Sequence, residues 1–321
     1  MKWLISFIAF AALQLVSAIP IEPSEHQLAK RAAYGDTANI GYATLNGGTT
    51  GGSGGSVTTV SSLSALTSAV SGTARKIVVI SGTITGNTVI RVGSNTSVIG
   101  LRGSSLVGVG LRVYRESNVI IRNVKISKVL ANVGDAIGVQ EASKVWIDHA
   151  DLSSDMDHDK DYYDGLLDIT HGCTEVTVSY TRFYNHWKGS LVGHSDSNAS
   201  EDTKMTVTYA YNYFSNINSR TPSFRFGRGH IYNNVFDNVG DGINTRVGAQ
   251  LLVENNVFSN TKKPLYSTSS GYAVARGNDF GGVANTAPTG TFTFAPYGYN
   301  LIATGSVRSQ VVGQTGQTLT F

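Results

Sequence analysis

The sequence predicts an all-β protein in which short parallel strands stack in successive coils, and three observations support this fold class. Short apolar segments end on a large apolar residue, and the last four of these residues, Phe214, Phe236, Phe258 and Phe280, are 22 residues apart. An asparagine stands two positions before each of the four. Apolar residues alternate within the segments, which indicates strands rather than helices. A constant step of this length predicts a solenoid with one continuous core.

Composition narrows the class of protein further. Of the 321 residues, 15% are charged and 41% hydrophobic, which excludes a disordered chain. The 36 glycines show no three-residue period, so collagen is excluded as well. The net charge of +3 is too small for a dedicated nucleic-acid-binding protein. Cys173 is the only cysteine, so no intrachain disulfide can form, and we interpret it as a buried structural residue.

The first 31 residues are interpreted as targeting and processing segments. Lys2, an apolar run over 3–16 and a small residue at Ala18 predict a secretory signal peptide over 1–18. The Lys30-Arg31 pair predicts the end of a pro-peptide over 19–31, although an ordinary polar linker would also fit. No second apolar segment is long enough to span a bilayer. We therefore expect a secreted, extracellular protein with one domain over 32–321 and neither a membrane nor a nucleic-acid partner.

Two sequence triplets are possible glycosylation sites in a secreted protein. They begin at Asn95 and Asn198.

The chain before the first strong strand contains the one helix that the pattern predicts. Leu63, Leu66 and Val70 fall on one face of a short amphipathic helix over 62–70, which would cap the open end of the solenoid. The segment 76–80 is the first strong strand, and the glycine-rich stretch 46–56 is expected to be a loop.

The earlier coils are longer than the later ones. Their closing residues are Ile126, Leu152 and Phe183, so the steps up to Phe214 are 26, 31 and 31 residues. Longer steps indicate loops inserted into the coils, and such insertions often form the binding face of a solenoid. The asparagine column predicts a ladder of amide hydrogen bonds between neighbouring coils.

Charged residues recur in four segments that are about one coil apart. The segments are 135–139, 164–169, 188–192 and 220–225, and we expect them on successive strands of one sheet. Asp164 and Asp168 are four residues apart and would share one face of an extended strand, with Asp135 one coil below. Three converging carboxylates repel each other unless a cation joins them, and hard oxygen ligands suit Ca²⁺.

Basic residues in the next two coils predict a groove for a polyanionic substrate. These residues are Lys188, Arg220 and Arg225. The alternative is a charged row on a solenoid surface without a specific role. A further acidic run over 155–161 lacks the glycine and the glutamate of an EF-hand, so we interpret it as a solvated loop.

Four short segments of the sequence resemble motifs of a known protein family. The segment Val145-Trp-Ile-Asp-His149 resembles the vWiDH motif of extracellular pectate lyases, and Arg220-Thr-Pro-Ser-Phe-Arg225 resembles their RxPxxR motif. Asp164-Gly-Leu-Leu-Asp168 and His186-Trp-Lys188 are similar to the calcium and lysine segments of the same family, polysaccharide lyase family 1. The resemblance extends over nearly the whole mature chain and is strongest to fungal members.

The resemblance implies a fold and a reaction. The fold would be a right-handed parallel β-helix, and the enzyme would be a monomer. The reaction would be a calcium-dependent β-elimination on polygalacturonate, the demethylated backbone of pectin, which gives 4,5-unsaturated oligogalacturonides. Asp135, Asp164 and Asp168 would bind Ca²⁺. Val133 stands where the family has a further acidic residue, so the number of calcium ions is left open.

The resemblance also implies roles for the basic residues. Arg220 matches the catalytic base, and Lys188 and Arg225 match residues that bind uronate carboxylates. Arg246, one coil further on, is similar to another substrate contact. A guanidinium is normally protonated, so an arginine base predicts an alkaline pH optimum.

Three alternatives remain at the level of sequence. A pectin lyase acting on methyl-esterified pectin without calcium would carry basic groups in place of the calcium ligands, which the retained Asp164 and Asp168 argue against. A polygalacturonase is a hydrolase that needs a placed acid and base, and its NTD, DD and GHG signatures are missing. A non-enzymatic β-helix binding protein would explain the solenoid but leaves the charged cluster unexplained.

Overall fold

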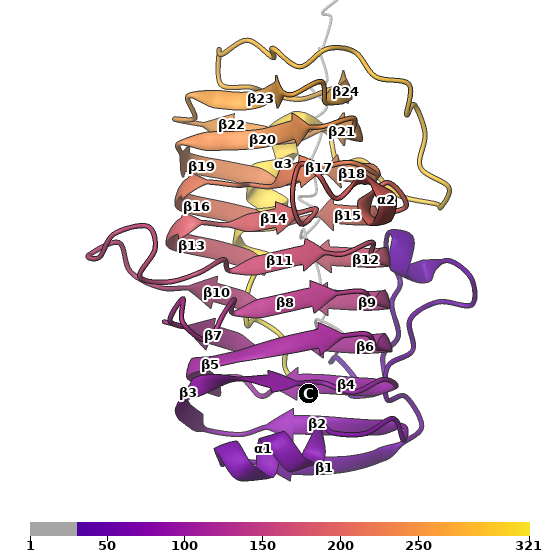
Figure 1. Ribbon diagram of the computed structural model, residues 1–321, viewed down its shortest axis with the longest axis vertical. Helices are drawn as coiled ribbons and strands as arrows, with labels where there is room; N and C mark the ends of the chain where they lie inside the picture. The colour runs from indigo at the N-terminus through magenta and orange to yellow at the C-terminus, as the bar shows by residue number, and fades with distance from the viewer. Residues whose placement is uncertain (1–30) are drawn as a thin grey trace, which may run out of the picture. The chain divides into compact units, whose positions relative to one another are not determined.

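The computed structural model describes residues 31–321, so the predicted signal peptide and nearly all of the predicted pro-peptide lie outside the described residues. Ala32–Phe321 form one compact unit of stacked parallel strands (Figure 1). Within this unit the chain coils repeatedly through two sheets, and each strand pairs in parallel with the matching strand of the next coil. The all-β solenoid predicted from the sequence is thereby confirmed.

The first sheet has ten strands, one from each coil. In spatial order they are β1 (Ser56–Val60), β2 (Lys76–Ile80), β4 (Thr96–Gly100), β6 (Ser117–Arg122), β9 (Ser143–Asp148), β12 (Thr174–Ser179), β15 (Thr206–Ala210), β18 (Arg228–Tyr232), β21 (Gln250–Glu254) and β24 (Tyr272–Arg276).

The second sheet has fourteen strands and consists of two ladders joined by β5 (Ser105–Tyr114), with which β3 (Thr83–Arg91) also pairs. The first ladder contains β7 (Lys125–Ser127), β10 (Asp151–Ser153), β13 (Arg182–Lys188), β16 (Tyr213–Ser219), β19 (Val235–Val239) and β22 (Val257–Ser259). The second ladder contains β8 (Ile137–Gln140), β11 (Leu167–Thr170), β14 (Ser190–Val192), β17 (Ser223–Arg225), β20 (Asp241–Arg246) and β23 (Lys263–Thr268).

The closing apolar residues form one column inside the first ladder. The strand register pairs Phe183 with Phe214, Phe214 with Phe236, and Phe236 with Phe258. Their rings stack with centroid separations of 4.5, 4.9 and 4.3 Å and interplanar angles of 3–5°. Offset aromatic stacking adds about 0.5–1.5 kcal/mol per pair to the burial of the rings. This column belongs to a continuous core that extends through all the coils.

The asparagine ladder is also present, in the turn that leads into the first ladder. The side-chain oxygen of Asn234 accepts from the backbone N–H of Asn212 at 2.8 Å and from its amide at 2.9 Å. Asn256 and Asn278 repeat this pattern in the next coils. Asn234 is fully buried, so the ladder satisfies backbone and side-chain polar groups that water cannot reach.

The N-terminal end of the solenoid is capped by helix α1 (Leu63–Ala69), as the sequence predicted. The hydroxyl of Ser62 accepts a hydrogen bond from the backbone N–H of Ala65, and Leu66 and Val70 are fully buried. The predicted loop over 46–56 ends one residue earlier than expected, because Ser56 is the first residue of β1 and pairs with Lys76.

The N-terminal segment of the described chain lies across the ten-stranded sheet and includes the short helix η1 (Tyr42–Thr44). Gly41 has a φ of 68°, and a side chain there would lie within 3 Å of Thr177 and Thr208. With a glycine at this position, the hydroxyls of Thr208 and Thr177 accept hydrogen bonds from the backbone N–H groups of Tyr42 and Ala43.

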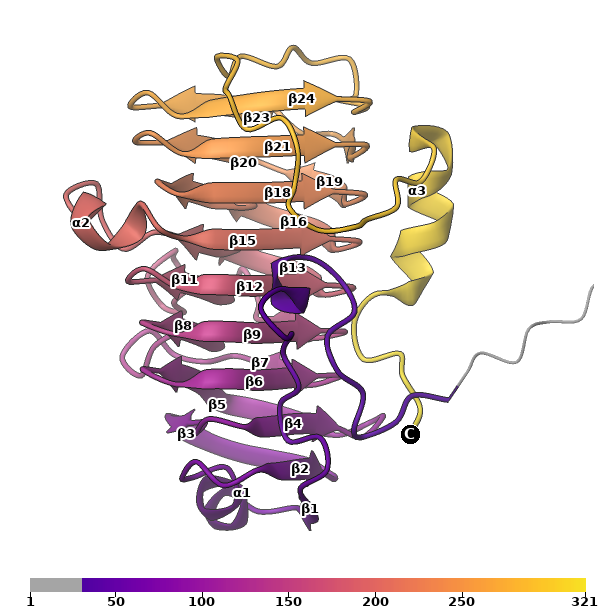
Figure 2. The same ribbon diagram turned by 90° about the vertical axis from the view of Figure 1, so that its right-hand side faces the viewer.

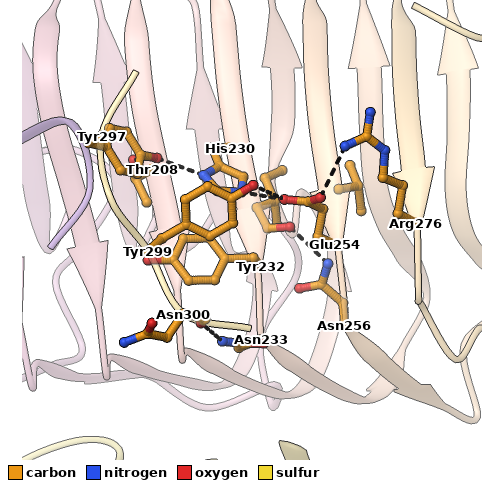
Figure 3. A network of polar contacts seen from close by, with 12 residues as sticks. Thr208, His230, Tyr232, Asn233, Glu254, Asn256, Arg276, Tyr297, Tyr299 and Asn300 are labelled. Carbon is orange, nitrogen blue, oxygen red and sulfur yellow. Dashed lines mark hydrogen bonds and ion pairs between the residues drawn. The ribbon is translucent and has the colours of Figure 1, made fainter. Parts of the chain in front are cut away.

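The C-terminal segment crosses the same sheet and joins a buried polar network (Figure 3). The hydroxyl of Tyr297 lies 2.8 Å from Nδ1 of His230, and the hydroxyl of Tyr299 donates to Glu254 at 2.9 Å. Nε2 of His230 lies 3.0 Å from the same carboxylate. Burial alone would raise the pKa of Glu254, but hydrogen bonds from His230 and Tyr299 lower it below its usual value. The network therefore joins the C-terminal segment to the carboxylate of Glu254, whose lowered pKa favours the charged form.

Beyond that network the chain forms α3 (Thr304–Val311) and the short helix η2 (Val312–Gln314), where Val307 and Val311 pack against Val235 and Val257. The chain then returns to the first residues of the compact unit (Figure 2). The ring of Phe321 stacks on Tyr34 at 5.3 Å, and the carbonyl of Thr320 accepts from the N–H of Ala32 at 3.1 Å.

Two further findings concern expectations drawn from the sequence. Cys173 is fully buried, and burial raises the pKa of its thiol to about 12, which agrees with a structural role. None of the helices within residues 31–321 is long and apolar enough to cross a membrane.

The asparagine ladder gives a prediction for stability. Asn234→Ala would leave the buried N–H and amide of Asn212 without their acceptor, so the free energy of unfolding should fall by at least about 2 kcal/mol in urea titrations. Asn87→Ala, on an exposed position of β3, is the control and should stay within about 0.5 kcal/mol of the wild type. Equal losses in both variants would contradict a specific role for the ladder.

Candidate active site

The four predicted charged segments run into consecutive strands of the second ladder, although their first charged residues, Asp135, Asp164, Lys188 and Arg220, lie before those strands. β8, β11, β14 and β17 follow one another in register, with Ile137 beside Leu167, Leu167 beside Ser190, and Leu191 beside Ser223 (Figure 1). The connection from the first ladder into each of these strands contributes further charged residues. The site is therefore built from one short segment per coil.

Two buried carboxylates form the acidic part of the site. Asp135 lies just before β8 and Asp168 lies on β11, and the two residues are 8% and 9% exposed. The backbone N–H of Gly165 donates to Asp135 Oδ1 at 3.0 Å, and the N–H of Leu191 donates to Asp168 Oδ1 at 3.0 Å. Each carboxylate is thus oriented by a backbone group of the next coil.

Gly165 allows these two carboxylates to approach each other. A Cβ atom at this position would lie 2.5 Å from Asp168 Oδ1 and 2.9 Å from Asp135 Oδ1. Real Cβ atoms do not come so close to oxygen, so any side chain here would displace at least one carboxylate. The glycine in the Asp164-Gly-Leu-Leu-Asp168 segment therefore has a steric role in the site.

The two acids repel each other in a poorly solvated position. Burial raises the pKa of Asp135 well above its usual range, and the charges of Asp168 and Asp164 raise it further. Burial also raises the pKa of Asp168, to about 6, although the charge of Arg220 opposes the shift. A bound cation would relieve this repulsion, and carboxylate oxygens suit a hard divalent ion such as Ca²⁺.

Asp164 differs from the arrangement expected from the sequence. β11 begins at Leu167, so Asp164 lies in the irregular segment before this strand and does not share a strand face with Asp168. Its side chain is 39% exposed, and its Oδ1 is 3.3 Å from Nζ of Lys188. Within the described residues, no three Asp, Glu, His or Cys side chains are grouped closely enough to hold a metal ion as they stand. The structure brings Asp135 and Asp168 together, with Asp164 at the edge of the pair.

The basic residues occupy the coils after the acids. Lys188, at the end of β13, contacts Asp164 and is also 3.6 Å from Asp161 of the acidic loop. Arg220 lies between β16 and β17, and its carbonyl accepts from the N–H of Ser190 at 2.6 Å. Its guanidinium has no hydrogen bond or ion pair within residues 31–321, while its charge acts on Asp168. Arg220 is therefore free to contact a ligand beside the acids.

Arg225 and Arg246 form a second group further along the ladder, where they are register partners on β17 and β20. Both contact the carboxylate of Asp196, which sequence reasoning did not identify. Asp196 lies in the loop after β14, inside one of the 31-residue coil steps. The step length indicated an insertion there, but not that one of its side chains would reach two arginines.

Arg112 is another neighbour of the acids that sequence did not indicate. It lies on β5 in register with Gly138, and a Cβ at Gly138 would lie 3.7 Å from Arg112 Nε and 3.6 Å from Asp135 Oδ2. Both atoms therefore lie near the same side of Gly138, and the charge of Arg112 lowers the pKa of Asp135 against the larger effect of burial. Nε of Arg112 is buried without a hydrogen-bond partner among the described residues. A fixed positive charge thus lies beside Asp135, while Val133 packs against the core.

The segment Val145–His149 lies in the ten-stranded sheet, away from the charged strands. Asp148 is buried, accepts from Arg122 Nε at 2.8 Å and accepts from the hydroxyl of Ser179 at 2.7 Å. Trp146 Nε1 in turn donates to that hydroxyl at 2.9 Å. These contacts support a structural role for the motif.

A pocket of about 580 Å³ lies elsewhere, over the starts of β15, β18 and β21. Tyr42, Phe292, Phe294 and Arg228 are among its lining residues, and none of the predicted site residues lines it. The charged cluster on the second ladder remains the better candidate for chemistry, because it combines buried acids with cations.

The two possible glycosylation sites stay predictions. The amide nitrogen of Asn95 donates to the carbonyl of Thr73 at 3.0 Å. That of Asn198 donates to the carboxylates of Glu201 and Asp202 at 3.1 Å. A glycan at either position would form at a nitrogen that the fold already uses.

Comparison with known proteins is consistent with this geometry. A family model described as pectate lyase matches residues 8–318. A probable pectate lyase A of Aspergillus niger is 58% identical over 323 residues, which span 100% of this chain and 99% of that protein. Among solved structures, a pectate lyase from Bacillus sp. N165 in complex with trigalacturonate superimposes with a TM-score of 0.80 at 35% identity, over 87% of this chain and 98% of that one.

The steric role of Gly165 gives a prediction for metal binding. Gly165→Ala should lower the free energy of unfolding by about 1–3 kcal/mol and weaken calcium binding at least about tenfold, because the new methyl group displaces the carboxylates. Urea unfolding and calorimetric calcium titration measure the two effects. Gly305→Ala, whose methyl group would meet no atom within 4 Å, is the matched control. Wild-type calcium binding by Gly165→Ala would contradict the assignment.

Proposed function

This chain belongs to the pectate lyase family, and from that premise we propose that it cleaves polygalacturonate by calcium-assisted β-elimination. The observation that supports this most is the buried Asp135–Asp168 pair, which lies near Lys188 and near Arg220. The guanidinium of Arg220 has no hydrogen bond or ion pair in the part of the chain that the structure describes. The carboxylates can bind a cation, and the neighbouring basic side chains can bind a polyanion beside it.

The substrate class follows from charge and from the comparisons. The related Bacillus sp. N165 pectate lyase is described in complex with trigalacturonate, a short polyuronate. A polyuronate carries one carboxylate per sugar. Basic side chains lie along three successive coils, with Lys188 in the first, Arg220 and Arg225 in the second and Arg246 in the third. We infer that demethylated pectin, rather than a neutral polysaccharide, is the substrate of this chain.

The acidic residues fit a calcium ion. Asp135 and Asp168 would hold it, and Asp164 would join them once its contact with Lys188 gives way. A bound Ca²⁺ would neutralise the uronate carboxylate and make the neighbouring C5 proton more acidic. Lys188 and Arg225 would bind carboxylates of the substrate and orient the chain of sugars.

Arg220 would accept the C5 proton in its neutral guanidine form, which alkaline pH favours. The electron pair of the C5–H bond then forms the C4–C5 double bond, the bond from C4 to the glycosidic oxygen breaks, and that oxygen takes up a proton from the solvent. The products are a shortened chain and a 4,5-unsaturated uronide. No water is added, so no second carboxylate is needed as in a glycoside hydrolase.

Pectin lyase is the second candidate function. It would act on methyl-esterified pectin, which needs no cation bridge to a carboxylate. Arg112 beside Asp135 is the observation that favours it, because it places a cation at the acidic end of the site. The pair of buried acids favours the calcium-dependent reaction more strongly.

We further propose that the enzyme is secreted and acts as a monomer on plant cell-wall material. The signal peptide over 1–18 and the pro-peptide over 19–31 would be removed. The compact unit begins at Ala32, the residue at which the mature chain is expected to start.

The proposal is tested by following the ultraviolet absorbance of the unsaturated uronide while the mature protein acts on polygalacturonate at alkaline pH. Absorbance should rise with calcium present and stop rising when excess chelator is added. A rise that persists in chelator, or that occurs only with methylated pectin, would favour pectin lyase. No rise on either substrate would refute the proposed lyase activity.

The role of Arg220 has its own test. Arg220→Lys keeps the charge but replaces the guanidinium, so kcat on polygalacturonate should fall at least about 100-fold, the range expected for loss of a general base. Arg102→Lys, at an exposed turn position, controls for the substitution itself and should keep wild-type kcat. Activity of Arg220→Lys near the wild-type level would remove Arg220 as the base.

A further inference from the structure

The loop after β14 is anchored to the solenoid by a buried acid. It contains the short helix α2 (Ala199–Asp202), and Asp202 is fully buried. One oxygen of Asp202 accepts from the backbone N–H of Gly172 at 2.8 Å, and the other accepts from the N–H of His194 at 2.7 Å. The loop is therefore held on both sides of its tip, and the residues between 194 and 202 have a defined position.

The tip of this loop presents Asp196 to two arginines of the second ladder. The carboxylate accepts a hydrogen bond from Arg225 Nε, and both of its oxygens lie 3.0 Å from one terminal nitrogen of Arg246. A second nitrogen of Arg225 donates to the carbonyl of Gly193 at 3.3 Å. The same loop thus fixes two of the three guanidinium nitrogens of Arg225.

The remaining donors are available for a ligand. The third nitrogen of Arg225 and one terminal nitrogen of Arg246 have no hydrogen bond within residues 31–321. Asp196 contributes one negative charge against two positive charges, so the group keeps a net charge of about +1. That charge matches a single carboxylate of a polyuronate.

Resting on the proposed function, we propose that Asp196 is a positioning residue, which fixes Arg225 and Arg246 as one site for a substrate carboxylate. A free arginine loses side-chain conformational entropy of up to about 2 kcal/mol when it is immobilised on a ligand. Asp196 holds both guanidinium groups in place before substrate arrives, so less of that entropy is lost on binding. The inserted coil thereby supports substrate binding without taking part in the chemistry.

In the opposite role, Asp196 would compete with a substrate carboxylate for Arg225 and Arg246. The side chain of Asp196 is 51% exposed, and a carboxylate that occupied the position of the substrate's own would have to leave before binding. Removing it would then strengthen substrate binding. The two roles predict opposite changes of KM.

The test compares Asp196→Ala, Asp196→Asn and Asp196→Glu in steady-state assays on polygalacturonate. With Asp196→Ala, KM should rise about fivefold or more while kcat changes less than about threefold. Asp196→Asn should lie in between, and Asp196→Glu should restore KM to within about threefold of the wild type. The control is Asp237→Ala. Asp237 lies on β19 and forms an ion pair with Arg308 of α3, so its removal also leaves an arginine without its carboxylate partner, and KM should not change.

The outcomes separate the inference from the proposed function. If the wild type cleaves polygalacturonate and Asp196→Ala has an unchanged or lower KM, the positioning role is wrong. A fall in kcat alone would also overturn it. If the wild type does not cleave polygalacturonate at all, both the proposed function and this inference fail. Unfolding midpoints of all variants show whether a change reflects lost structure, and Asp196→Asn, which keeps the shape of the side chain, decides the question if Asp196→Ala does not fold.

Discussion

The in-register hydrogen bonding of parallel strands is the constraint on which the rest of this structure depends. Because each coil repeats the register of the one before, a residue type that recurs once per coil becomes a column, as with the phenylalanine rings and the buried amides of Asn212, Asn234 and Asn256. The same register places Asp168 one rung from Leu191, whose N–H orients it. Core and site therefore rest on one set of backbone contacts.

The site derives its character from the order of charges along the solenoid axis. Acids lie in the coils of β8 and β11, and cations follow in the coils of β14, β17 and β20. Gly165 keeps the acidic end compact, since it leaves space that the carboxylates of Asp135 and Asp168 occupy. A polymer lying along the axis would pass each charge in turn. Charges that repeat along the polymer could therefore contact charges that repeat from coil to coil.

Features that rest on periodicity could be predicted from the sequence, whereas features that depend on loop conformation could not. The strand ladders, the phenylalanine and asparagine columns and the helix at Leu63–Ala69 were all expected, because each rests on local pattern. Asp164 was expected on a strand but lies in the irregular segment before β11, where alternation does not predict the direction of a side chain. Asp196 could not be foreseen, because its contact with the arginines depends on the path of an inserted loop. Arg112 belongs to a coil with no charged motif of its own.

The contact between the segment before β1 and the segment after η2 has a consequence for how the molecule folds. A solenoid can grow one coil at a time, since each coil pairs with a neighbour already formed. Tyr34 stacks on Phe321, however, and Ala32 bonds to Thr320, so these contacts join segments that all the coils separate in the sequence. The stacking of neighbouring coils does not form them. The early coils therefore gain this contact only after the later strands and α3 have been made.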